Sequence, residues 1–99
     1  MNYLDRVAQE VERQLSDDDR PDERAIELYR LYALLVLVRG QHTSLENVHD
    51  AWSAWTTAEE PDHRSLVPFA ELQPEQQELD RPYLEAIQRA AERVRQHLI

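Results

Sequence analysis

Apolar residues along much of the chain recur at steps of three and four, which is the period of a helix that packs on one side. The two clearest stripes are Leu4, Val7, Val11 and Leu15 near the start, and Leu84, Ile87, Ala91, Val94 and Leu98 near the end. No stretch shows the strict alternation of apolar and polar residues that a half-buried strand requires. The pattern therefore predicts an all-α protein.

A different pattern fills the segment between these stripes, where almost every residue from Leu28 to Val38 is apolar. A helix that is apolar all round is normally surrounded by other helices. We therefore expect residues 22–39 to form the central and most buried helix, with Leu34 and Leu35 both inside it. Gly40 is suited to the left-handed conformation that ends many helices.

The stretch "SLENVHDAWSAW" predicts a further helix over residues 44–56. Thr43 and Glu46 have the spacing of a capping box, in which each side chain bonds the other residue's backbone amide. The apolar face of this helix is formed by Leu45, Val48, Trp52 and Trp55.

Proline and short polar residues separate the helices. Pro61 and Pro68 interrupt the segment after residue 56, whereas Pro74 suits a first helical turn and Pro82 suggests a fresh start after Asp80. The expected architecture is a single domain over residues 1–99, a small bundle of three long helices plus a short helix packed around the second helix. Its segments are helix 1–15, linker 16–22, central helix 22–39, helix 44–56, irregular connection 57–73, short helix 74–79 and last helix 81–98.

Composition narrows the class of protein. The 99 residues include no Cys, which excludes disulfides and Cys-based zinc sites. The net charge is −9, and no basic stripe is available to displace counterions from a nucleic acid, so we expect no direct binding to DNA or RNA. The acidic charge also allows a weaker hypothesis, in which the protein imitates nucleic acid as a decoy. The longest apolar run is far shorter than the ~20 residues of a membrane span, and no secretory signal precedes it, so we expect a cytoplasmic protein without membrane contact.

The sequence contains few of the residue arrangements that catalysis or metal binding requires. His49 and Asp50 are neighbours on a predicted helix and point about 100° apart, so they do not orient each other. No serine lies in a nucleophile elbow. The four histidines, His42, His49, His63 and His97, lack the spacing of helical zinc sites. We expect neither an enzyme nor a bound metal or cofactor.

Three blocks, "ENVHDAW", "HRSLVPFAEL" and "ELDRPYLEAIQRA", together resemble the repeat domain of ryanodine receptors, which also occurs alone in bacterial and phage proteins. The resemblance covers about Ser44 to Ala91. The chain also looks like small proteins of actinobacteria and their phages, which suits its Lys-free composition. Two positions depart from the family pattern: Thr56 replaces a common Arg, and Arg64 replaces the Pro after the second histidine.

The resemblance implies a non-enzymatic binding module for an adenine nucleotide or a nucleotide-derived ligand, used for sensing or sequestering, with His49 and Trp52 lining the site. We add Trp55 as a flanking aromatic residue, and an anionic ligand needs at least one Arg in the same cleft, for which Arg64 or Arg81 is the candidate.

Other interpretations of these residues remain open. In a second interpretation, Trp52 and Trp55 fill the core, and His49 bonds a backbone carbonyl near "LVPF". The alternative function is a protein-interaction or structural adaptor without a small ligand, with a protein partner or a homodimer as its assembly.

Overall fold

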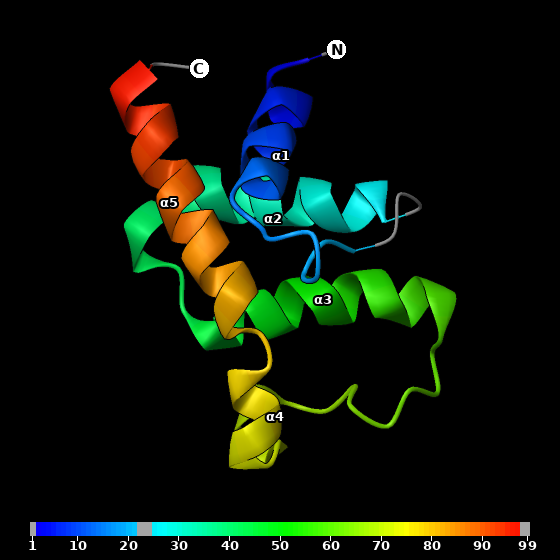
Figure 1. Cartoon of the computed structure of the whole chain (residues 1–99). Helices are drawn as coiled ribbons and strands as arrows, with labels where there is room; N and C mark the ends of the chain where they lie inside the picture. The colour runs from blue at the N-terminus through cyan, green and yellow to red at the C-terminus, as the bar shows by residue number, and fades with distance from the viewer. Residues whose placement is uncertain (1, 22–24, 98–99) are drawn as a thin grey trace.

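The computed structural model describes residues 2–21 and 25–97, and their regular structure is entirely helical (Figure 1). The elements are α1 (Tyr3–Arg13), α2 (Ile26–Val38), the 3₁₀ turn η1 (Gly40–His42), α3 (Leu45–Glu59), the 3₁₀ turn η2 (Phe69–Glu71), α4 (Pro74–Glu78) and α5 (Arg81–His97). Three long helices, α1, α3 and α5, pack against α2. The predicted all-α bundle around the second helix is confirmed.

Helix α1 begins where Asn2 accepts a hydrogen bond at its side-chain oxygen from the amide of Asp5, at 2.9 Å. It ends at Arg13, two residues before the predicted end, and Met1 lies outside the described residues. Val7 and Val11 are completely buried, so the stripe read from the sequence is the face that α1 packs against the core.

Helix α2 is central, but it is not buried all round. Tyr32 and Ala33 face the core, whereas Leu34 is 48% exposed. The expectation that Leu34 is buried is therefore wrong, because three neighbouring helices do not cover the whole circumference of α2. The helix starts at Ile26 rather than at residue 22, and the predicted start lies partly in residues 22–24, outside the described residues.

Helix α3 is capped one residue later than predicted. The side chain of Ser44 accepts from the amide of Asn47 at 3.1 Å, and the side chain of Asn47 accepts from the amide of Ser44 at 3.0 Å. Thr43 instead donates to the carbonyl of Gly40 at 2.8 Å. The predicted Thr43–Glu46 box is therefore wrong, because two adjacent residues had competing cap chemistry.

The second half of the chain follows the predicted order with shifted boundaries. Helix α3 continues to Glu59, three residues past its predicted end, because no Pro or Gly intervenes before Pro61. Helix α4 has Pro74 in its first turn and ends at Glu78, one residue before its predicted end. Helix α5 starts afresh at residue 81 and is described to His97, since Leu98 lies outside the described residues.

The turn between α2 and α3 brings α5 close. Gly40 has a φ of +55°, as its predicted left-handed role requires. Ala86, Ala90 and Ala91 on α5 are buried, and small side chains there let α5 approach η1 closely. Within the described residues, none of the helices combines the length and the apolar character needed to cross a membrane.

Candidate functional site

A hollow that we name the aromatic cleft lies between α2, α3 and the start of α5. Its volume is about 720 Å³, within the usual range for small-molecule sites. Trp52, Trp55 and Glu59 reach it from successive turns of α3, since residues three and four apart share a helical face. The lining residues are Pro21, Ala25, Leu28, Tyr32, Trp52, Trp55, Glu59, Glu60, Asp80 and Tyr83.

Aromatic rings form much of the wall of this cleft and hold one another in place. The rings of Tyr32 and Tyr83 stack with their centroids 5.8 Å apart and an interplanar angle of 28°. The rings of Trp52 and His63 form a T-shaped pair with their centroids 5.1 Å apart. The wall is therefore held by contacts within the protein itself.

The charged groups in the described lining of the cleft are acidic. Asp80, Glu59 and Glu60 line it, and its described lining includes no Arg, Lys or His side chain. Burial raises the pKa of Asp80, and the nearby His49 opposes that rise. Burial and, next, the proximity of Asp80 raise the pKa of Tyr32 well above its ordinary value of 10.0, so this phenol stays protonated. The cleft therefore favours neutral or positively charged ligand groups over anions.

A smaller hollow, the histidine pocket, adjoins the aromatic cleft. It measures about 220 Å³ and shares Trp52 and Asp80 with the larger cleft, so the two hollows meet at these residues. Its lining residues are His49, Trp52, His63, Ser65, Leu72, Gln76, Leu79 and Asp80.

His49 is a structural residue as well as part of this pocket. Its side chain is 2% exposed, and its Nε2 donates a hydrogen bond to the carbonyl of Val67 at 2.7 Å. Its ring stacks on Trp52 at 5.7 Å and approaches Phe69 at 6.2 Å. The interpretation in which His49 bonds a carbonyl of the "LVPF" segment is confirmed, and this bond ties the irregular connection to α3.

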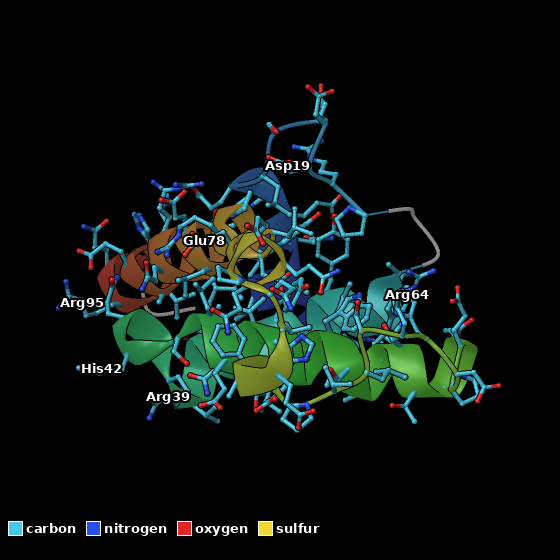
Figure 2. All side chains as sticks on the ribbon, turned by 90° about the horizontal axis from the view of Figure 1, so that it is seen from below. Asp19, Arg39, His42, Arg64, Glu78 and Arg95 are labelled. Atoms are coloured by element: carbon cyan, nitrogen blue, oxygen red, sulfur yellow. The ribbon has the colours of Figure 1, made fainter. Side chains whose placement is uncertain are left out.

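The structure brings His49, Trp52 and Trp55 together but places Arg64 and Arg81 elsewhere. Arg64 is exposed on the connection and lines neither hollow. Arg81 is exposed and forms a two-point ion pair with Glu78, at 2.9 and 3.0 Å. Figure 2 shows Arg64 and Glu78 well apart. We expected Arg64 or Arg81 to contact an anionic ligand in the cleft, and neither residue lines it.

Sequence reasoning identified the two tryptophans of the cleft but missed its tyrosines and its carboxylates, which are Tyr32, Tyr83, Asp80, Glu59 and Glu60. Asp80 carried a signal, since it stands between two predicted helices, but we interpreted it only as a break. Tyr32 and Tyr83 are separated by half the chain, and only the packing of α5 on α2 brings them together.

Comparison with known proteins gives one match. No curated protein and no solved structure matches the chain significantly. The model of a family described as a domain of unknown function, DUF7701, matches residues 2–92, which is nearly the whole chain. The helical domain with its acidic, aromatic cleft therefore belongs to the DUF7701 family.

Proposed function

We propose that this protein is a non-enzymatic module that binds a small, planar, nitrogen-rich molecule in the aromatic cleft. The observation that carries the proposal is the combination of Trp52 and Trp55 with the carboxylates of Asp80 and Glu59 in one cleft of about 720 Å³. Stacking on an aromatic side chain contributes about 1–3 kcal/mol per base. A hydrogen bond from a ligand amino group to a carboxylate adds about 1.5–3 kcal/mol.

Among nucleotide-derived ligands, we propose a nucleoside or free base with an exocyclic amino group, such as adenosine. Its flat ring suits the indole surfaces, and its amino group suits the carboxylates. A phosphate is disfavoured, because the described lining offers it three carboxylates and no guanidinium. The resemblance to the ryanodine-receptor repeat supports the base and not the phosphate part of that family's ligand.

The hydrogen bonds of the histidines support a binding role over catalysis. The hydroxyl of Ser53 lies 3.5 Å from Nε2 of His49, which at first suggests a nucleophile and its base. That nitrogen already donates its proton to the carbonyl of Val67 at 2.7 Å, so it has no lone pair for Ser53. Nδ1 of His63 accepts from the amide of Ser65 at 3.0 Å and is occupied as well.

Isothermal titration calorimetry with adenosine, AMP and ATP tests the proposal. We expect adenosine to bind most tightly and AMP roughly tenfold more weakly, because unit charges about 10 Å apart near a protein surface interact by ~1–2 kcal/mol. ATP should bind weaker still. Binding of ATP at least as tight as that of adenosine would contradict the charge argument.

Two variants on one helix locate the site. Glu59→Gln removes a charge at the cleft and should weaken adenosine binding, whereas Glu46→Gln, in the first turn of α3, should leave it unchanged. Equal effects of both changes would place the ligand outside the cleft.

The second candidate function is a protein-interaction adaptor without a small ligand. The observation that favours it is the set of exposed apolar side chains on α2, including Leu34 and Val38. If no nucleoside or base gives heat in the titrations, the small-ligand proposal fails and the adaptor remains.

A further inference from the structure

One face of α2 presents apolar side chains to solvent. Leu34, Leu37 and Val38 are 48%, 41% and 64% exposed. Leu37 and Val38 follow Leu34 by three and four positions, so each lies beside Leu34 on the helix surface. Leu31 and Leu35, which are partly buried, border them. We name Leu31, Leu34, Leu35, Leu37 and Val38 the open face of α2.

The neighbouring helices of the same chain do not cover this face. Helices α1 and α5 cross in front of α2 and α3 runs below it, as Figure 1 shows. They bury the side of α2 that carries Tyr29, Tyr32, Ala33 and Val36. Four of the six exposed large hydrophobic side chains in the described part of the chain belong to α2. The exposure is therefore concentrated on one element, as expected of an interaction surface rather than of scattered surface residues.

The charges at the ends of the open face identify its occupant. Glu27 lies in the first turn of α2 and is exposed, and its carboxylate accepts a hydrogen bond from Arg30 at 2.6 Å. Arg39 directly follows the last turn and is exposed too, and it donates to the side chain of Asn47 at 3.2 Å and to the carbonyl of His42 at 3.1 Å. Figure 2 shows Arg39 at an edge of the molecule. If a second α2 lies antiparallel on the first, Glu27 of each copy comes beside Arg39 of the other. In such a dimer each of these side chains turns from its partner within the chain to the opposite charge of the second copy. A two-fold interface forms this pair twice and is complementary to itself.

We propose that the protein forms a homodimer in which two α2 helices pack antiparallel through their open faces, with Glu27 of each copy beside the partner's Arg39. Antiparallel packing also sets the two helix dipoles side by side in opposite directions, so that each positive end lies beside a negative end. The occupant is a second copy because an exposed carboxylate at one end of the helix, an apolar middle and an exposed guanidinium just past the other end match the same sequence reversed. This interface lies on a different side of α2 from the aromatic cleft, so its test is independent of the proposed ligand.

The first experiment measures mass in solution by sedimentation velocity over a range of micromolar concentrations, at physiological salt to screen the −9 charge of each copy. The mass should rise with concentration from 11.7 kDa towards twice that value. Leu34→Asp and Val38→Glu should both keep the helical circular dichroism spectrum and remain at the monomer mass. Leu79→Asp is the matched control, since Leu79 is 69% exposed but lies beyond α4, and it should dimerise as the wild type does.

A charge exchange then tests the antiparallel arrangement. Glu27→Arg alone and Arg39→Glu alone should each raise the dissociation constant several-fold, because each places like charges together at both ends. The double variant should restore it to near the wild-type value. A monomer at every concentration, an equal loss with Leu79→Asp, or a double variant no better than the single ones would overturn the proposal.

Discussion

Replacing His49 by Ala tests whether this buried histidine holds the irregular connection onto α3. The change removes the donor to the carbonyl of Val67, a bond of 2.7 Å, and leaves a void between Trp52 and Phe69. An acceptor left without its donor costs about 1–3 kcal/mol, and large-to-small changes in a core cost about 2–5 kcal/mol. Both costs should fall in the lower part of their ranges, because the carbonyl is only partly buried and the connection can relax into the void. We therefore expect the free energy of unfolding to fall by about 3 kcal/mol.

The loss is large for a domain of this size, whose free energy of unfolding is about 5–15 kcal/mol. Each kcal/mol shifts the melting temperature of a domain this size by roughly 4–8 °C, so His49→Ala should melt about 12–24 °C lower. Thermal unfolding followed by far-UV circular dichroism measures the shift. His42→Ala is the control, since His42 is exposed and its bonds to Arg39 are made by its backbone: its amide donates to the Arg39 carbonyl at 2.9 Å, and its carbonyl accepts from the Arg39 side chain at 3.1 Å. A melting temperature of His49→Ala equal to that of His42→Ala would refute the structural role.

Two further outcomes follow from burial. Ala33→Asp should unfold the domain, because Ala33 is fully buried and an unpaired charge there costs several kcal/mol. Leu34→Asp should stay folded, because Leu34 is exposed. Equal melting temperatures of the two variants would contradict the orientation of α2. Burial raises the pKa of the Asp80 carboxyl above its ordinary value of 3.8. Between these two pKa values the folded state binds more protons than the unfolded state. The free energy of unfolding therefore falls as the pH rises from 3.8 through the pKa of the folded state. Asp80→Asn removes the cost of burying this charge, so the variant should be more stable than the wild type at neutral pH, and the difference in stability should shrink towards pH 3.8. Urea unfolding at a series of pH values measures this difference. A difference that grows on acidification would show that the pKa of Asp80 is lowered in the folded state and not raised.

Periodicity predicted the helices well because most of their residues have one dominant role. Val7 and Val11 lie on the same face of α1 whatever packs against it, and both are fully buried as expected. Proline and glycine were similarly informative, since Pro74 and Gly40 act through their own backbone geometry. The cap of α3 was misplaced by one residue because Thr43 and Ser44 have the same chemistry, and only the local backbone selects between them.

The parts that the sequence did not predict depend on which helix lies beside which. An apolar helix such as α2 does not reveal which side its neighbours leave open, so the exposure of Leu34 appears only in the fold. The same limit applies to the site. Trp52 and Trp55 share one helix and were identified, whereas Tyr32 and Tyr83 come from two helices. The position of Arg81 was readable in part, because Glu78 three residues earlier is its ion-pair partner.

The position of the tryptophans has a practical consequence. The sequence contains two, Trp52 and Trp55, and both line the aromatic cleft. Indole emission from the unlabelled protein therefore originates entirely from this one hollow. Water entering or leaving the cleft shifts the emission wavelength, and a stacked ring quenches its intensity, while events confined to α1 or to the far end of α5 leave both unchanged. The protein thus carries an optical reporter at the surface where we place its ligand.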